Sequence, residues 1–262
     1  MSVLPDIIRH VEKLSGHALD NDEGVHHGDA NVHVTGATVC WMASPDAIEA
    51  AGQRGHQLLI CHESLYFPYD AVILSQPPPN WKSWKVNRQR RELLDRYGLT
   101  FLRVHGSADK ICIFDTFAEL LGLGHPVIAE GLCKVYDIPE CPLDELVRMV
   151  KRRMGMSAVR VAGGKDMRRM VKRVGLPWGG LGLFVNVGYQ QRLAELGCDV
   201  FIAGEADNYG FRFAAENAIP MIETSHELSE NPGLRRFTAL VAQAFPEVTF
   251  RFYENECIWR VE

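Results

Sequence analysis

Residues 58–68 read Leu-Leu-Ile-Cys-His-Glu-Ser-Leu-Tyr-Phe-Pro, a stretch in which a short apolar run ends at two polar side chains. Four apolar residues in a row predict a short buried β-strand. His62 and Glu63 follow directly, and neither suits a core position, because burying an imidazole or a carboxylate requires a partner. Both are good ligands for a divalent metal ion. The stretch therefore predicts a strand whose carboxyl end carries metal ligands.

Length and composition indicate a globular protein of one large domain or two lobes, since the chain has 262 residues. A formal net charge of −5 gives no general attraction to nucleic acid or anionic membranes. No apolar run approaches the roughly 20 residues of a membrane span, and the first residues lack the apolar region of a signal peptide. Seven cysteines without a C-x-x-C pattern indicate neither a disulfide framework nor a zinc knuckle. We expect reduced thiols, no membrane partner and a cytoplasmic location.

Strands and helices alternate along both halves of the chain, and a strand–helix–strand order predicts a parallel crossover unit. The run Gly-Leu-Gly-His-Pro at 122–126 breaks the composition between the halves. The sequence therefore predicts an α/β fold of two related lobes, 1–124 and 125–262. The expected strands are 34–42, 57–61, 100–104, 158–162, 182–187, 199–203, 219–223, 247–253 and 256–261, and the expected helices are 4–14, 45–54, 88–97, 110–121, 143–154, 188–196, 207–217 and 232–245.

Two further segments resemble binding motifs. The run Gly-Gly-Leu-Gly at 179–182 lacks the glycine or alanine that the dinucleotide pattern requires at Val185. It predicts a tight turn, with backbone amides that could meet an anion. Residues 81–91 interleave tryptophan, lysine and arginine, which is typical of a single-stranded nucleic-acid surface. The acidic balance elsewhere favours the alternative, a mobile loop that runs into the solvated face of helix 88–97.

Polar side chains follow the carboxyl ends of several predicted strands, in the pairs His62/Glu63 and His226/Glu230 and at His105, Asp109 and Glu205. In open α/β sheets this edge is where ligands bind, so we expect one shared crevice between the lobes.

The geometry of each pair sets a condition. His62 and Glu63 can converge only if the backbone leaves the strand at Cys61, because successive strand residues face opposite ways. His226 and Glu230 would share one helical face at their i,i+4 spacing. Pro232, however, suits a first helical turn, so a loop over 226–231 is the alternative.

The donors are imidazoles and carboxylates. This set suits a site for zinc, manganese, iron, cobalt or nickel better than it suits a structural zinc site. Even five such groups exceed the needs of one tetrahedral ion. Two ions about 3.5–4 Å apart would use them and leave positions for water.

With these motifs in place, the chain resembles the Nif-three-like family (NGG-one-interacting-factor-three-like, also labelled GTP cyclohydrolase I type 2 homologues) along nearly its whole length. The family's L-I-I-T-H-H-P-L-F-F is similar to residues 58–67, and its H-T-x-x-D to residues 105–109. Its T-G-E is similar to residues 203–205, its G-H-x-x-T-E to residues 225–230, and its G-L-x-x-G-D to residues 24–29.

The resemblance implies a dinuclear metal site in a toroidal homohexamer. The ligands that it implies are His62, Glu63, Asp109, His226 and Glu230, with Glu63 where the family's second histidine usually stands. A glutamate adds charge and a harder donor there, which bears on the identity of the metal. Two more departures are Met42 and Ser44, which replace the aspartate and threonine of the family's first-strand motif.

Two functions follow from these observations. The first is a metal-dependent hydrolase in which Glu205 or Glu63 is the general base and a small molecule is the substrate, a nucleotide being the candidate that the family label implies. The second is a non-catalytic ring that handles metal or binds partners, with residues 81–91 as a contact surface.

Overall fold

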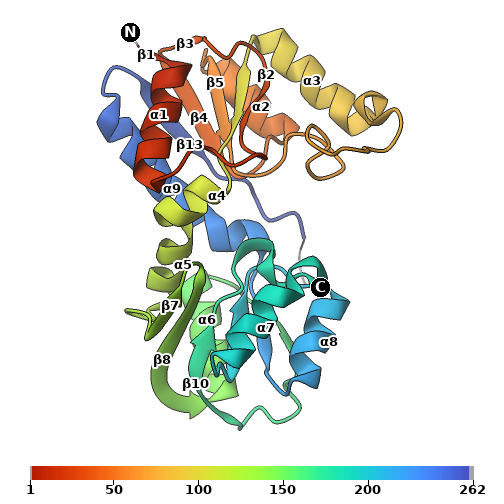
Figure 1. Cartoon of the computed structure of the whole chain (residues 1–262), viewed down its shortest axis with the longest axis vertical. Helices are drawn as coiled ribbons and strands as arrows, with labels where there is room; N and C mark the ends of the chain where they lie inside the picture. Colours follow the sequence, from red (N-terminus) through yellow and green to blue (C-terminus); the bar gives the residue numbers. More distant parts are fainter. Residues whose placement is uncertain (1, 260–262) are drawn as a thin grey trace. The chain divides into compact units, whose positions relative to one another are not determined.

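The structure is a computed structural model that describes residues 2–259. It divides into two compact units, each built of a β-sheet and helices (Figure 1). Unit 1 comprises the chain up to Ile113 together with Gly233–Asn255, and unit 2 comprises Phe114–Pro232 together with the segment that follows Asn255. The predicted α/β fold of two lobes is confirmed. The shared crevice stays a prediction.

The units are not contiguous along the chain, which differs from the simple division at residues 124 and 125. Strand β13 (Thr249–Tyr253) pairs in parallel with β4 (Gly36–Cys40), so the segment 233–255 belongs to unit 1. A pairing between strands this distant in sequence depends on the tertiary fold, and no local pattern in the sequence announces it.

The sheet of unit 1 has the order β13-β4-β5-β6-β2. The strands β4, β5 (Leu58–Cys61) and β6 (Thr100–Arg103) are parallel neighbours, and β2 (Gly24–His27) closes one edge in the antiparallel sense. All residues of β4, β5 and β6 are buried, which explains their continuous apolar runs. A separate small sheet joins β1 (Ser2–Val3) and β3 (His33–Val34).

Helices α2 (Pro45–Gln53) and α3 (Lys85–Tyr97) pack together against this sheet in one apolar cluster. The start of α2 follows the sequence signals, since the Ser44 side chain accepts the backbone N–H of Ala47. Elsewhere in unit 1, α1 (Leu4–Ser15) meets the end of α9 (His226–Ala244) through the rings of His10 and Phe245. The short helical elements of this unit are η1 (Trp81–Ser83), α4 (Gly106–Ala108) and η2 (Asp109–Ile113).

The sheet of unit 2 has the order β7-β8-β10-β11-β12-β9, in which β10, β11 and β12 are parallel. Helices α7 and α8 contribute to the apolar cluster over one face, and Figure 1 shows α6 behind the sheet. The strands are β7 (Ile128–Glu130), β8 (Cys133–Pro142), β9 (Arg160–Ala162), β10 (Met170–Gly175), β11 (Val200–Ala203) and β12 (Met221–Glu223), and the helices are α5 (Phe114–Leu121), α6 (Leu143–Met154), α7 (Val187–Glu195) and α8 (Asn208–Glu216), with the 3₁₀ turns η3 (Gly179–Gly182) and η4 (Phe184–Asn186).

The predicted strand at 182–187 is wrong. That segment lies in the turns η3 and η4 and at the start of α7, and the parallel neighbours of β11 are β10 at Met170–Gly175 and β12. The apolar residues there are not paired into the sheet, since Phe184 and Val185 are 52% and 82% exposed. The predicted strand at 256–261 lies partly outside the described residues, and residues 256–259 form no strand.

Among residues 2–259, every helix is too short or too polar to cross a membrane.

Candidate metal centre

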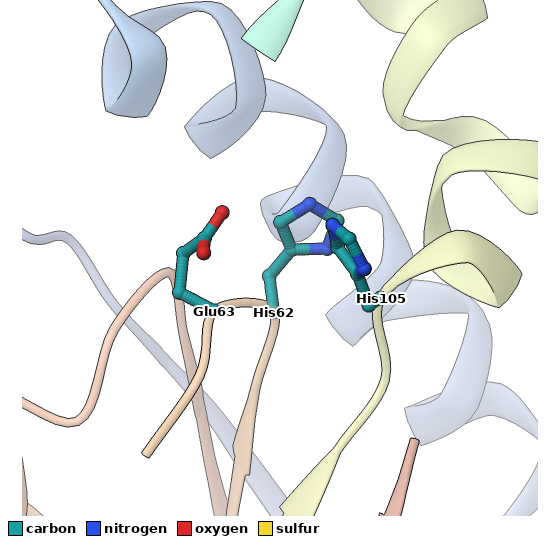
Figure 2. Close-up of side chains that lie close together, drawn as sticks. All are labelled: His62, Glu63 and His105. Atoms are coloured by element: carbon teal, nitrogen blue, oxygen red, sulfur yellow. The ribbon is translucent and has the colours of Figure 1, made fainter. Parts of the chain in front are cut away.

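The first cluster of polar side chains lies in unit 1, where strands β5 and β6 end next to each other. Strand β5 ends at Cys61, so the backbone has left the sheet before His62 and Glu63, as their convergence requires. The N–H groups of both residues donate to the carbonyl of Trp41, at 3.1 and 2.8 Å. Figure 2 shows the side chains of His62, Glu63 and His105 gathered at this edge. Each offers a donor atom, and these atoms lie within 4.8 Å of one another.

The orientation of His62 is fixed by the main chain. Its Nδ1 lies 3.2 Å from the carbonyl oxygen of Val104, which can only accept a hydrogen bond. Nδ1 therefore carries the proton, and Nε2 presents a lone pair on the side of Asp109, whose Oδ1 is 3.9 Å away. Histidine ligands of metals are held in this way by a hydrogen bond at the other ring nitrogen. The sequence prediction grouped His62 with Asp109, and the structure places them together.

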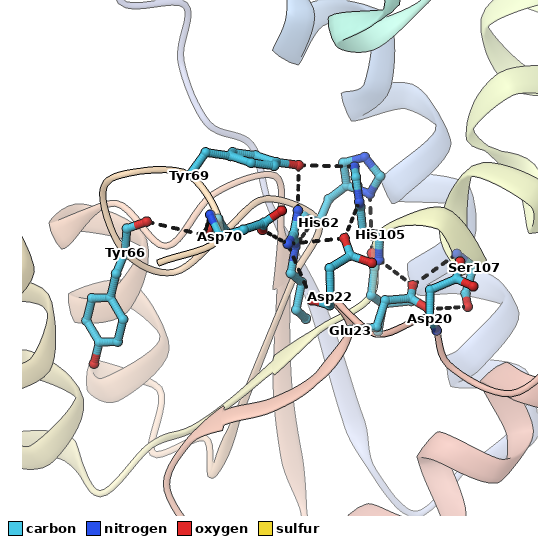
Figure 3. Close-up of polar contacts among 12 residues, drawn as sticks. Asp20, Asp22, Glu23, His62, Tyr66, Tyr69, Asp70, His105 and Ser107 are labelled. Carbon is cyan, nitrogen blue, oxygen red and sulfur yellow. Dashed lines mark hydrogen bonds and ion pairs between the residues drawn. The ribbon is translucent and has the colours of Figure 1, made fainter. Parts of the chain in front are cut away.

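His105 joins this cluster and is held by a carboxylate. Its Nδ1 lies 2.7 Å from Oδ2 of Asp22, and its Nε2 lies 3.4 Å from the hydroxyl of Tyr69 (Figure 3). The rings of His105 and His62 are 4.8 Å apart between centroids. The hydrogen bond from His105 is the main cause that lowers the pKa of Asp22 to about 2. Asp22 thus stays ionised as an acceptor.

A fully buried guanidinium supports both histidines. Arg103 donates from Nε to the carbonyl of His62 at 3.2 Å and from Nη2 to the hydroxyl of Tyr69 at 2.5 Å. Its Nη1 pairs with Asp70 and lies 3.2 Å from Asp22 Oδ2. Sequence reasoning missed Arg103 and Asp22. An arginine inside the apolar run 100–104 was the available signal, because a buried charge requires partners.

The second cluster lies in unit 2, where β11 and β12 end. Helix α9 begins at His226 and includes Pro232, so the alternative of a loop over 226–231 is wrong. His226 and Glu230 share one helical face, and Nε2 of the imidazole lies 3.4 Å from Oε1 of the carboxylate. Nδ1 lies 3.0 Å from Oε2 of Glu205, which follows β11.

Glu205 orients the imidazole of His226 in unit 2 as Asp22 orients that of His105 in unit 1. The hydrogen bond with His226 is the main cause that lowers the pKa of Glu205. The carboxylate therefore accepts a hydrogen bond from the Nδ1–H group of His226, and Nε2 of the same ring faces Glu230. The backbone N–H of Glu205 donates to the carbonyl of Gly179 at 2.7 Å.

The glycine run at 179–182 forms the turn η3 and packs against the second cluster. Gly179 has a positive φ of 49°, and a β-carbon there would overlap Oε1 of Glu230 and lie 3.3 Å from Nε2 of His226. A β-carbon at Gly204 would likewise overlap the backbone of Gly179, most closely at its carbonyl oxygen. The predicted tight turn is confirmed, and the two glycines leave room for the side chains of the cluster.

The predicted site residues thus fall into two groups. Unit 1 brings together His62, Glu63 and Asp109 and adds His105, while unit 2 brings together His226, Glu230 and Glu205. Imidazole nitrogens with an oriented lone pair, next to carboxylate oxygens, are compatible with binding of a divalent metal ion.

Comparison with known proteins agrees with the fold. The sequence matches the family described as Duf34/NIF3 (NGG1p interacting factor 3) over residues 4–257. The Bacillus cereus protein related to NIF3 superposes with a TM-score of 0.79 at 13% identity, over 100% of this chain and 99% of that one. Protein ybgI has a TM-score of 0.79 at 18% identity, over 98% and 99%. Reduced HcgD from Methanocaldococcus jannaschii has a TM-score of 0.74 at 18% identity, over 96% and 97%. No curated protein matches the chain.

Proposed function

Because the chain belongs to the Duf34/NIF3 family, we propose that it binds two divalent metal ions and is a cytoplasmic metal-dependent hydrolase of a small substrate, with a nucleotide as one candidate. The observation that carries this proposal is the gathering of His62, Glu63 and His105 donor atoms within 4.8 Å at the ends of neighbouring parallel strands. The ligands in the proposal are His62, Glu63, Asp109, His226 and Glu230, as the family resemblance implies, together with His105, which the structure adds to the first cluster.

The donor set fits such ions. His62 and His226 each have a partner at Nδ1 that leaves Nε2 as the donor atom. Glu63 offers a harder oxygen donor than a histidine, which favours manganese or iron over softer ions relative to a site with two histidines. Zinc, cobalt and nickel remain in the proposed set, because imidazole nitrogen suits all of them.

A bound divalent ion lowers the pKa of a coordinated water toward neutrality and so supplies the nucleophile of a hydrolysis. Glu63 and Glu205 were the two predicted bases, and their surroundings differ. Glu205 accepts the hydrogen bond of His226, so we assign it the positioning of that imidazole. Glu63 is 3% exposed and lies among the donor atoms of the first cluster. We assign it the proton transfer, with one oxygen as ligand and the other as acceptor.

The test is calorimetric titration of the metal-free protein with manganese and with zinc, followed by assay of phosphate esters, nucleotides and cyclic amides. His62→Ala and His226→Ala should each weaken binding by more than about 100-fold, because even the loss of a group that orients a ligand costs roughly 10–100-fold. Turnover should disappear with binding. His33→Ala, at an exposed histidine outside both clusters, is the control.

Substitutions of Glu63 test its role as a ligand in the same titration. Glu63→Ala should weaken one of two binding steps and leave the other nearly intact, whereas Glu63→His should preserve or tighten zinc and nickel binding, because imidazole is the softer donor. A parent protein that binds no metal would refute the proposal. Tight binding without turnover of any substrate would support the non-catalytic metal-handling alternative.

We also propose a closed homohexamer as the family resemblance implies, and light scattering of the same preparation tests it.

A further inference from the structure

The basic and aromatic segment at 81–91 has no part in the proposed metal chemistry. In unit 1 it borders a cavity of about 280 Å³, whose described lining comes from β2, the segment after β5, η1 and α3. The lining residues are His26, Tyr66, Val72, Trp81, Lys82 and Arg91. None of these is acidic, and none is a proposed metal ligand.

Aromatic rings and cations face this cavity together. The rings of Tyr66 and Trp81 lie 5.4 Å apart between centroids, at 55° to each other. Nζ of Lys82 lies 5.5 Å from the centroid of the Trp81 ring. Arg91 brings a second cation from the first turns of α3. The cavity therefore combines flat apolar surface with positive charge.

Buried polar contacts hold the cavity walls in place. Asn87, 1% exposed, donates to the carbonyls of Phe67 at 2.6 Å and Trp81 at 2.8 Å, and accepts the N–H of Phe67. Arg90, 5% exposed, donates to the carbonyl of Leu65 at 2.6 Å and stacks on the ring of Phe67. Hydrogen bonds thus fix both ends of the segment 65–81 to α3. The cavity therefore has walls held by buried polar contacts.

The charge of the cavity is positive near neutral pH. Burial raises the pKa of Tyr66, so its phenol stays protonated. Burial and the charge of Arg103 lower the pKa of His26, so its imidazole is neutral. The nearest acids of α3 have other partners, since Asp95 lies 3.0 Å from His27 and Glu92 lies 3.7 Å from Arg88. Lys82 and Arg91 therefore give the cavity its net charge.

We propose that this cavity binds one nucleotide unit, with the base against Trp81 and Tyr66 and the phosphate between Lys82 and Arg91. Aromatic side chains stack on every base, and lysine and arginine are the usual partners of phosphate oxygens. The volume of about 280 Å³ lies just below the usual range for small-molecule sites, roughly 300–1,000 Å³, so the cavity admits a single unit and no folded partner.

The unit can come from a free mononucleotide or from a single strand of nucleic acid. Trp84, Lys85 and Arg88 continue the same chemistry along the surface beyond the cavity, and all three are exposed. A strand would engage them in addition to the cavity, whereas a free mononucleotide would not. Net acidity of the whole chain does not oppose this, because the segment itself carries five cations and no acid between residues 81 and 91.

The experiment is calorimetric titration of the full chain with adenosine monophosphate, adenosine and inorganic phosphate at fixed ionic strength, with fluorescence anisotropy of a short labelled oligodeoxyadenylate. Trp81→Ala and the double variant Lys82→Ala with Arg91→Ala should each weaken binding at least about tenfold, while Trp81→Phe should retain most of it because the ring remains. The control double variant, Lys85→Ala with Arg88→Ala, removes equal charge outside the cavity and should leave binding of the mononucleotide within about twofold.

If that control weakens only the oligonucleotide, the natural ligand is a strand. If it weakens neither ligand, the natural ligand is a free mononucleotide. The proposal is overturned if neither ligand binds the parent protein, or if the control double variant weakens the mononucleotide as much as the cavity variant does. Metal content should be unchanged in every cavity variant, and His62→Ala should still bind the nucleotide. A failure of this inference is therefore distinguishable from a failure of the proposed metal chemistry.

Discussion

The two clusters of potential ligands reach their geometry by different routes. In unit 2, His226 and Glu230 lie one turn apart at the start of α9, so their proximity follows from helical spacing, and glycines leave them room. In unit 1, His62 and His105 follow two different strands, and their proximity follows from the parallel pairing of β5 and β6. Each histidine has its own orienting acceptor. The second cluster therefore depends on close packing, and the first on the sheet and its hydrogen-bond network.

The largest effect is expected from a methyl group at Gly179, which tests whether the second cluster depends on close packing. Gly179→Ala forces a β-carbon into Glu230 at a position of positive φ, and overpacking with backbone strain should cost roughly 2–3 kcal/mol of unfolding free energy. Urea unfolding measures this cost. Gly188→Ala is the matched control, because a β-carbon at Gly188 in α7 meets nothing within 4 Å and should be neutral or slightly stabilising. Equal stability of both variants would show that the second cluster is not closely packed.

Removal of the orienting carboxylates should distinguish the clusters next. Glu205→Gln disturbs the one histidine of the second cluster, so the metal affinity should fall roughly 10–100-fold. Asp22→Asn acts directly on His105 and leaves the hydrogen bond at Nδ1 of His62 in place, because that nitrogen donates to a main-chain carbonyl. The fall in metal affinity for Asp22→Asn should therefore lie at the lower end of the roughly 10–100-fold range.

Calorimetric titration with zinc gives both affinities. Asp137→Asn, which breaks an exposed pair with Arg173, serves as the control and should bind zinc as the parent does. A larger loss for Asp22→Asn than for Glu205→Gln would mean that His105, and not His226, contributes more to binding.

A fall in pH should have a smaller effect than these substitutions, by reducing the contribution of Asp22 to the unfolding free energy. The pKa of Asp22 falls from 3.8 to about 2 in the folded protein, mainly because of its hydrogen bond with His105. A group with a lowered folded pKa stabilises the protein above its unfolded pKa, and this contribution is lost as the pH falls through the folded value. The difference in unfolding free energy between the parent and Asp22→Asn should narrow by roughly 1 kcal/mol between pH 6 and pH 3.

Urea unfolding at a series of pH values measures that difference. Glu205→Gln should show a weaker dependence, because the Glu205 side chain is 46% exposed and solvent screens its interaction. A gap that widens toward pH 3 for Asp22→Asn would contradict the role assigned to the Asp22–His105 pair.

Short-range features were predictable because they depend on neighbours in the sequence. The apolar run ending at Cys61 predicts β5 and places His62 and Glu63 beyond it, and Ser44 with Pro45 predicts the start of α2. The same signals failed at 182–187, where an apolar segment between glycines forms 3₁₀ turns instead of a strand. Burial against other elements decides such cases, and local propensity does not.

The sequence by itself determined the donor types, their spacing and their position after strands, and these sufficed for an α/β fold with metal-ligand chemistry. Only the tertiary structure decided which acceptor orients each imidazole. Asp22 and His105 are 83 residues apart, and the guanidinium of Arg103 meets Asp70 and Tyr69 from a different element. The tertiary structure also decided that β13 pairs with β4 in the sheet of unit 1. The physical reason is that hydrogen-bond partners and strand neighbours are chosen among groups distant in the chain, for which the local sequence carries no preference.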